Sequence, residues 1–148
     1  MEIRVARKSE IPALVEFNQA MALETEGKHL DGEVLRKGVE AVFDDDAKGF
    51  YVVAEDAGKI VGGLMVTYEW SDWRNAWFWW IQSVYIRPEA RGQRIYSSLY
   101  GFVRTRAAEA GNVCGFRLYV ETDNVHAQQV YESVGMHASH YLMYEEKA

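Results

Sequence analysis

The hydrophobic positions change their period along the chain, and each change predicts an element. The longest apolar run, Ala76–Ile86, is rich in aromatic and β-branched residues, which predicts a central strand buried on both faces. Arg87-Pro88 ends this run, because proline cannot donate to a strand ladder. Apolar residues then recur at helical spacing over Ile95–Ala110, which predicts a helix. Its apolar face carries Tyr96, Leu99, Val103, Ala107 and Ala110.

The N-terminal third predicts one strand and two helices. Glu2–Arg7 alternates between apolar and polar residues, as a half-buried strand does. We expect Ser9 to cap the first helix and Asp31 to cap the second, with the polar stretch Glu24–His29 linking the two. Carboxylates are unfavourable at a helix C-terminus, so the run Asp44–Asp46 is expected just beyond the second helix.

A hairpin is predicted next, with strands Phe50–Glu55 and Lys59–Glu69 joined at Asp56-Ala57-Gly58. Gly62-Gly63 inside the second strand indicates a bulge or a close approach by another group.

The C-terminal part predicts three further elements. These are a strand at Phe116–Glu121, a helix at Val125–Val134 with Asn124 as its cap, and a last strand at Ser139–Glu145. The order β-α-α-β-β-β-α-β-α-β is typical of an α/β domain with helices flanking a mixed central sheet. With 148 residues, one domain spanning 1–148 is expected.

Composition narrows the functional classes. A net charge of −6 argues against a nucleic-acid surface. Charged or polar residues interrupt every apolar run before it reaches the length of a membrane helix, so no membrane association is expected. Cys114 is the single cysteine, which excludes an intrachain disulfide and favours a cytoplasmic location. The histidine spacing predicts no metal site.

The segment after the central strand has the chemistry of an anion site. A buried strand leads into a basic turn with one glycine, Gly92, and then into a helix. The amides of a helix N-terminus point toward a bound anion, and Arg91 and Arg94 add positive charge.

This segment, within this element order, resembles the GNAT superfamily of acyl-CoA-dependent N-acetyltransferases over nearly the whole chain. The family motif is Arg/Gln-x-x-Gly-x-Gly/Ala, and residues 91–96 read RGQRIY, so Arg94 and Tyr96 stand in the two small-residue positions. A second family feature is an asparagine that opens the next helix and a tyrosine further along it, here Asn124 and Tyr131. The stretch TYEWSDW at 67–73 is similar to the polyamine and thialysine acetyltransferase branch.

The resemblance implies acetyl-CoA as co-substrate and no metal. The backbone of Val84, Tyr85 and Ile86 would bond the pantetheine arm as an added strand does. Asn124 and Ala127 would meet the pantetheine from the later helix. The pyrophosphate would lie against Arg91, Gly92, Gln93, Arg94, Ile95, Tyr96 and Ser97.

The resemblance also implies that Tyr131 lies near the thioester sulfur and assists the departing thiolate. Reference pKa values of about 10 for tyrosine and about 8.5 for a thiol make full proton transfer uphill by only about 2 kcal/mol. The alternative is a core tyrosine whose ring is packed and whose hydroxyl is satisfied.

The proton acceptor for the incoming amine is left open. In the polyamine branch a glutamate occupies the position of Gln82, and glutamine cannot accept the proton. Glu69 is the first candidate base, because it ends a strand beside the expected site, and water leading to bulk solvent is an equal alternative. Asp72 and Glu121 are further acids at the acceptor end. Glu24 and Glu26 either bind a cationic acceptor or are solvated loop residues.

Two functions therefore compete. One is an N-acetyltransferase, cytoplasmic and with a homodimer as one expected assembly, that acts on a primary amine of a small molecule by direct attack. The other is a catalytically impaired CoA-binding or protein-interaction module of the same fold. Asn124 and Tyr131 favour the enzyme, whereas Gln82, Arg94 and Tyr96 favour the module.

Overall fold

The computed structural model describes residues 1–148, which form two compact units, Met1–Leu118 and Tyr119–Ala148. The first unit holds a five-stranded mixed sheet in the order β1-β2-β3-β4-β5. Its strands are β1 Glu2–Val5, β2 Phe50–Asp56, β3 Lys59–Ser71, β4 Ala76–Ile86 and β5 Val113–Arg117. Its helices are α1 Ile11–Glu26, α2 Gly32–Asp44 and α3 Ile95–Ala110, with short 3₁₀ turns at Lys8–Glu10 and Pro88–Ala90. The expected α/β class with a mixed sheet is confirmed.

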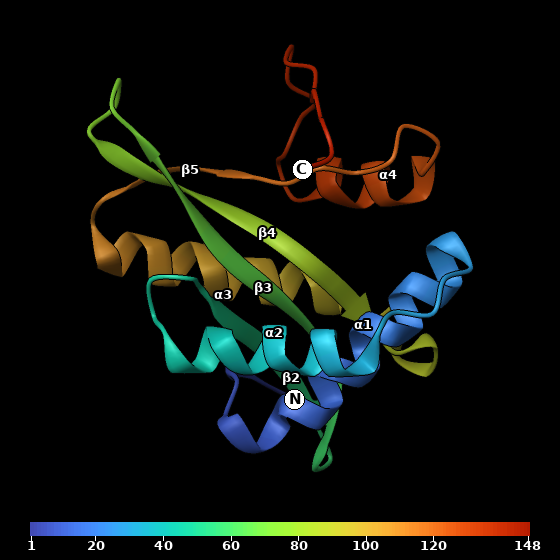
Figure 1. The fold of residues 1–148 in the computed structure, drawn as a ribbon. Coiled ribbons are helices and arrows are strands. Elements are labelled where there is room, and N and C mark those ends of the chain that lie inside the picture. The colour runs from blue at the N-terminus through green and yellow to red at the C-terminus, as the bar shows by residue number, and fades with distance from the viewer. The chain divides into compact units, whose positions relative to one another are not determined.

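Neighbouring strands from β1 to β4 are antiparallel, and only β5 runs parallel to its neighbour β4. Helices α1 and α2 cover one face of the sheet and α3 covers the other (Figure 1). Two adjacent glycines show these faces directly. A Cβ on Gly63 would approach Leu14 of α1, and a Cβ on Gly62 would approach Ile95 of α3.

The core follows from this arrangement. Between the sheet and helices α1 and α2 lies a cluster of buried residues. The helices contribute Leu14, Phe17 and Val39, and the sheet contributes Tyr51, Val53 and Tyr85. Strand residues of the opposite parity face α3, because successive side chains alternate across a sheet. The fully buried residues on this side are Val52, Leu64 and Val66 of the sheet and Leu99 and Val103 of α3.

Several local predictions are confirmed. Helix α3 has the predicted bounds. Asp31 caps α2, where its Oδ1 accepts hydrogen bonds from the amides of Glu33 and Val34 at 3.0 and 3.2 Å. The β2–β3 turn has left-handed residues at Ala57 and Gly58, with φ of 49° and 77°, as a tight hairpin requires.

Both interpretations of the glycine pair in β3, a bulge and a close approach by another group, are confirmed. The β2–β3 register shifts between Ala54 and Glu55, beside Gly62, which marks a bulge. A Cβ on Gly62 would also lie 2.7 Å from the Ile86 side chain, and one on Gly63 would lie 3.0 Å from the Val52 carbonyl. A side chain at Gly63 would press on backbone, whereas one at Gly62 would require the end of the Ile86 side chain to move.

The start of α1 and the link to α2 differ from prediction. Ser9 lies inside the 3₁₀ turn and does not cap the helix, because Glu10 is the N-cap and its carboxylate accepts the Arg7 amide at 2.7 Å. Helix α1 also continues to Glu26, so Glu24 and Glu26 are helical and not part of a loop. It ends at Gly27, whose φ of 62° provides a left-handed C-cap.

The central strand and its helix are less buried than predicted. In β4, Phe78, Trp79, Ile81 and Tyr85 are buried, but the remaining residues are half-exposed. Ala110 at the end of α3 is exposed, because the last buried position of that helix is Ala107.

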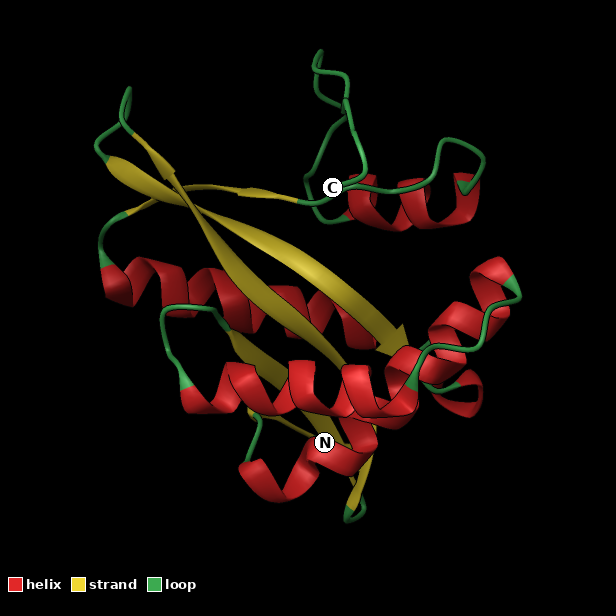
Figure 2. Cartoon of the chain, in the orientation of Figure 1, coloured by secondary structure: helices red, strands yellow, loops and turns green.

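The C-terminal elements shift or are missing. The strand expected at Phe116–Glu121 is β5, Val113–Arg117, because only these residues pair with β4. The second unit holds one helix, α4 Val125–Ser133, capped by Asn124 as predicted. The strand expected at Ser139–Glu145 is absent, and those residues are drawn as loop in Figure 2. An apolar segment alone does not make a strand, since the backbone also needs a strand to pair with. The expectation of one domain over 1–148 stays a prediction.

Candidate active site

The site begins where β4 and the edge strand β5 separate. On one edge β4 pairs with β3 along its length, from Ala76 to Ile86. On the other edge it pairs with β5 only as far as Trp80, opposite Arg117. The backbone of β4 from Ile81 onward is therefore open on that edge, and an extended ligand can pair with it.

A bulge lies within this open segment. Gly63 pairs with Tyr85 and Met65 with Gln82, so two β4 residues, Ser83 and Val84, face one residue of β3. Ser83 has a φ of 53°, in the left-handed region that non-glycine residues seldom adopt. A bulge bends its strand and changes the direction of the next backbone groups. No feature of the sequence marked Ser83 for this conformation.

Beyond the bulge, the ladder determines which backbone groups reach the open edge. The Arg87 amide donates to the Val61 carbonyl at 2.8 Å, toward β3. Since directions alternate along an antiparallel ladder, the N–H and C=O of Ile86 point to the open edge and those of Tyr85 point to β3. The Ile86 carbonyl accepts Arg91 Nε at 2.9 Å, which leaves the Ile86 amide for a ligand.

The turn after β4 presents amides at the start of α3. Gly92 has a φ of 80°, and a Cβ placed there would have no neighbour within 4 Å. The first helical bond in this turn joins the Ser98 amide to the Arg94 carbonyl at 3.2 Å. The preceding amides of the first turn project from the helix end, where they can bind an anion.

Arg94 stands where the family motif has a glycine, and its backbone tolerates the change. Its φ and ψ are 58° and 30°, within the left-handed helical region open to all L-residues at a modest cost. The angles do not lie in the region reserved for glycine. The Arg94 side chain is exposed and forms no hydrogen bond or ion pair with the chain, so its guanidinium can meet an anion.

Tyr96, at the other small-residue position, directs its ring into the core. Its side chain is 7% exposed and lies parallel to Tyr100, with the ring centroids 6.0 Å apart. Ile95 is also buried, whereas Ser97 is exposed. Only the backbone of Ile95 and Tyr96 therefore faces the turn.

Glu24 meets the turn from α1. Its carboxylate accepts the Tyr85 hydroxyl at 2.9 Å and Arg91 Nη2 at 2.8 Å, and the Arg91 guanidinium lies 5.5 Å from the centre of the Tyr85 ring. The Arg91 hydrogen bond lowers the pKa of Glu24, whereas burial and the neighbouring carboxylate raise the pKa of Tyr85. Glu24 thus has two protein partners, and its contact with a cationic acceptor stays a prediction.

Glu69 lies on β3, opposite Phe78. It accepts hydrogen bonds from Trp80 Nε1 at 2.7 Å and from Arg117 Nη1 at 3.0 Å, and the Trp80 bond is the main cause of its lowered pKa. Arg117 also lies over the Phe78 ring, 3.6 Å from its centre. The sequence analysis did not identify Arg117, and only its place on the alternating strand next to β4 could have pointed to it.

The other acceptor candidates belong to different elements of the chain. Gln82 Nε2 donates to Thr67 Oγ1 at 2.7 Å, on the strand next to β4. Asp72 accepts the Trp73 amide at 2.9 Å in the β3–β4 turn. Glu26 ends α1 and pairs with Lys28 at 3.5 Å. Glu121 belongs to the second unit, where its backbone carbonyl accepts the Asn124 amide at 3.0 Å.

The remaining predicted residues lie in the second unit. Asn124 Oδ1 accepts the Ala127 amide at 3.1 Å, so these two residues bond to each other as a helix cap. Tyr131 lies in α4, and burial raises the pKa of its hydroxyl. The Met136 amide closes the helix end on the Tyr131 carbonyl at 3.1 Å.

Two kinds of feature are absent from residues 1–148. No helix has both the length and the apolar composition needed to cross a bilayer. No three side chains among the histidines, cysteines, aspartates and glutamates come together as ligands for a metal ion.

A strand with one open edge, a bulge and an amide-rich turn at a helix start is the architecture of a protein that binds an extended, phosphorylated ligand. The sequence profile of the acetyltransferase (GNAT) family matches residues 14–136. The chain belongs to the GNAT acetyltransferase family, whose members transfer the acetyl group of acetyl-CoA.

Solved structures agree with this placement. The chain is similar to a possible acetyltransferase from Clostridium difficile 630, with 45% identity, 99% of this chain and 97% of that chain covered, and a TM-score of 0.92. It shares its fold with a predicted acetyltransferase from Clostridium acetobutylicum whose structure was solved with acetyl-CoA. The identity is 16%, 98% of this chain and 95% of that chain are covered, and the TM-score is 0.80.

An aminoglycoside 6'-N-acetyltransferase from Acinetobacter haemolyticus also shares the fold. The identity is 14%, 100% of this chain and 99% of that chain are covered, and the TM-score is 0.79. No curated protein matches the chain.

Proposed function

We propose that this protein transfers the acetyl group of acetyl-CoA to a primary amine of a small molecule, by direct attack of the amine on the thioester. The observation that carries the proposal is the open edge of β4 beyond Trp80, which continues into the turn at the start of α3. A linear arm can pair with the strand while its phosphates meet the helix amides.

The residues of the first unit fit this co-substrate. The Ile86 amide, together with the backbone of Val84 at the bulge, would pair with the pantetheine arm. The turn from Gly92 to Ser97 would bind the pyrophosphate, with the Arg94 guanidinium as a further donor. Acetyl-CoA supplies the activated acyl group, and a β4 amide that polarises its carbonyl would stabilise the developing oxyanion.

The amine arrives as an ammonium and has to lose a proton before it attacks. Glu69 is poorly suited to accept this proton, because Trp80 and Arg117 stabilise its charged form. Gln82 has no basic group and bonds to Thr67. We therefore favour water as the proton acceptor, with Glu69 holding Trp80 and Arg117 in place beside the acceptor.

Tyr131 is the proposed partner of the departing thiolate, and Asn124 and Ala127 are proposed to contact the pantetheine. Because burial raises the pKa of Tyr131, donation of a hydrogen bond is favoured over full proton transfer. The likeness to the polyamine and thialysine branch favours small cationic amines, for which Glu26, Asp72 and Glu121 remain proposed contacts. A cytoplasmic location and a homodimer stay predictions.

The competing proposal is a CoA-binding module without activity. Gln82 at the base position and Tyr96 in the motif favour it. Arg94 adopts the left-handed angles without a glycine, at a cost of about 1–2 kcal/mol, and this removes one argument for the module because the turn keeps its shape.

The test combines binding and turnover. Acetyl-CoA should raise the melting temperature of the protein, because it binds only the folded state. Free thiol should then appear in the presence of a suitable member of a panel of diamines, polyamines, thialysine and amino sugars. Binding without thiol release from any amine would support the inactive module, and no binding of acetyl-CoA or CoA would refute both proposals.

A matched pair of variants localises the binding. Gly92 and Gly111 both have left-handed backbones, with φ of 80° and 77°, and both have open space around them. Valine at either position imposes similar backbone strain, but Gly111 lies at the far end of α3. Gly92→Val should lose stabilisation by acetyl-CoA, whereas Gly111→Val should keep it. Equal losses in both variants would place the pyrophosphate elsewhere.

A further inference from the structure

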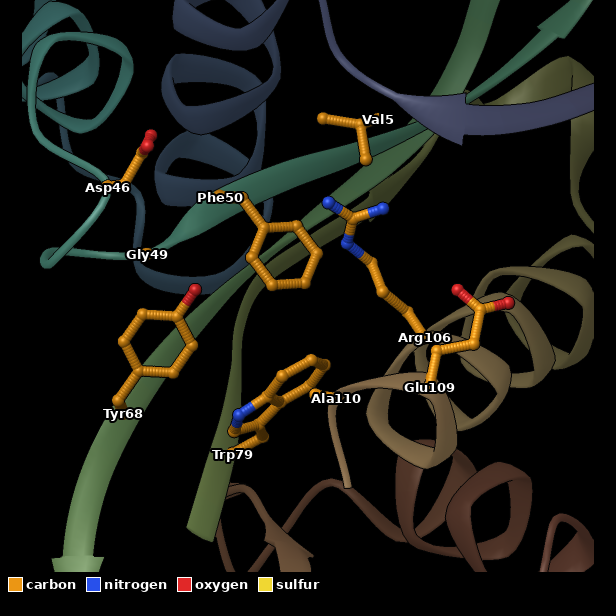
Figure 3. A pocket seen from close by; sticks show the side chains of 9 residues that line it. All are labelled: Val5, Asp46, Gly49, Phe50, Tyr68, Trp79, Arg106, Glu109 and Ala110. Atoms are coloured by element: carbon orange, nitrogen blue, oxygen red, sulfur yellow. The ribbon is translucent and has the colours of Figure 1, made fainter. Parts of the chain in front are cut away.

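A second concavity lies on the α3 face of the sheet, at the end of α3 away from the turn. Its volume is about 530 Å³ (Figure 3). The α3 residues that line it lie near Ala110, about 22 Å along the helix from Ile95 at a rise of about 1.5 Å per residue. It is therefore separate from the candidate active site. Its lining consists of Val5, Asp46, Gly49, Phe50, Tyr68, Trp79, Arg106, Glu109 and Ala110.

Three aromatic rings form the apolar part of this concavity. Phe50 and Trp79 meet edge to face, with ring centroids 5.4 Å apart and an interplanar angle of 75°. Tyr68 lies 5.8 Å from Trp79 and 6.4 Å from Phe50. The rings come from three adjacent strands and point into one space (Figure 3). A flat apolar group can stack or meet edge to face with them.

Two hydrogen-bond donors in this space have no partner in the protein. Trp79 is only 6% exposed, yet its indole N–H makes no hydrogen bond within the chain. The Arg106 guanidinium lies 5.2 Å from the centre of the Phe50 ring and forms no ion pair. Neither donor is among the fully buried polar atoms that lack a partner, so both reach solvent, and a ligand that carries an acceptor can take the place of water here.

Two carboxylates stand at the same concavity. Asp46 comes from the segment after α2, and Glu109 follows Arg106 on α3 (Figure 3). Neither forms an ion pair or a hydrogen bond. With Arg106 they give a formal net charge of −1, which disfavours a phosphate dianion. They can bind an ammonium, while Arg106 binds an anion.

We propose that this concavity binds a small zwitterionic amino acid with an aromatic side chain. The ligand carboxylate bonds to the Arg106 guanidinium and the Trp79 indole N–H. Its ammonium group meets Asp46 or Glu109, and its ring packs against Phe50 and Tyr68. The chemistry of the lining selects the class, because a zwitterion is the one simple ligand that uses the donors, the carboxylates and the rings together.

The indole N–H groups report directly on this proposal. The protein has five tryptophans and so five indole resonances in a ¹⁵N-labelled sample, of which Trp79→Phe identifies one. Unlabelled L-tryptophan is added to the protein alone, and the same titration is made with tryptamine, which lacks the carboxylate, and with indole-3-propionate, which lacks the amine. The Trp79 resonance should shift with L-tryptophan and titrate at least about tenfold more weakly with either analogue.

Arginine variants provide the second arm. Arg106→Gln should weaken binding of L-tryptophan by about tenfold or more, because a charge-assisted bond to the carboxylate is lost. Arg104→Gln is the matched control, since Arg104 lies on the same helix over Tyr100 and outside the concavity. It should leave the affinity unchanged.

Three outcomes would overturn the proposal: no shift of the Trp79 resonance at about 10 mM ligand, equal affinity for all three compounds, or equal affinity of Arg106→Gln and the parent protein. Because the titration contains no acetyl-CoA, its result is independent of the proposed acetyl transfer.

Discussion

Replacing Glu24 by glutamine separates two roles for this side chain. In the structure Glu24 neutralises Arg91 and accepts the Tyr85 hydroxyl, so it ties the end of α1 to the turn that is proposed to bind pyrophosphate. If Glu24 instead served as a contact for a cationic acceptor, its loss would weaken the binding of the amine.

The cost to stability follows from the two contacts. The Arg91 and Glu24 side chains are 48% and 40% exposed, so their ion pair contributes only about 0.2–1 kcal/mol. The Tyr85 bond to the carboxylate is charge-assisted, and the glutamine oxygen keeps a neutral bond that is weaker by about 1 kcal/mol. The free energy of unfolding should fall by about 1–2 kcal/mol, which corresponds to a fall in melting temperature of about 3–6 °C.

Binding of acetyl-CoA should become tighter. Two like unit charges about 8 Å apart repel by roughly 0.5 kcal/mol at the permittivity of water and by roughly 2 kcal/mol at an effective value of 20, which sets the order of magnitude for a carboxylate beside the anion turn. Glu24→Gln removes that charge and leaves the Arg91 guanidinium without a carboxylate. The Kd of acetyl-CoA should fall by about twofold to thirtyfold, with a steeper dependence on salt.

The assay measures acetyl-CoA affinity by calorimetry at two salt concentrations, together with KM for the best amine of the panel. Glu40→Gln is the control, because Glu40 lies on α2, pairs with Arg36 and has no proposed contact with either substrate. It should change neither constant. A raised amine KM in Glu24→Gln, with acetyl-CoA affinity unchanged, would refute the reasoning and return Glu24 to the acceptor site.

Three further predictions concern catalysis, the turn and the fold. Tyr131→Phe should lower kcat by about 100-fold and leave acetyl-CoA affinity unchanged, because the hydroxyl acts only as charge develops on sulfur; unchanged turnover where chemistry limits the rate would remove it from the mechanism. Arg94→Gly should change the free energy of unfolding by less than about 1 kcal/mol, since relief of the left-handed angle is offset by a more flexible unfolded chain; a larger loss in urea unfolding would mean that the side chain supports the fold. Glu10→Gln should cost about 2 kcal/mol at pH 7, since Glu55 still pairs with Arg4. Because the Arg4 hydrogen bonds lower the pKa of Glu10, its contribution is present above the unfolded pKa of about 4.3 and is lost as pH falls through the folded pKa, so the two proteins should converge in stability at acidic pH.

The features that the sequence by itself determined are those with local causes. The bounds of α3, the Asp31 and Asn124 caps and the Ala57-Gly58 turn each follow from residues within a few positions of one another. Helix periodicity, capping and turn chemistry act over this range, so a sequence pattern contains them. The place of the anion turn between a strand and a helix was predictable for the same reason.

Tertiary structure decided the features that depend on partners far along the chain. Glu24 lies 67 residues from Arg91, and Arg117 lies 48 residues from Glu69, so no spacing rule could join either pair. The residues 139–145 include the apolar run Tyr141–Tyr144 that predicted a strand, but they pair with no other strand. The bulge at Ser83 and the end of β4–β5 pairing at Trp80 arise from the register of three strands. Local propensity selects the elements, whereas long-range pairing and side-chain contacts determine which backbone groups remain open to a ligand.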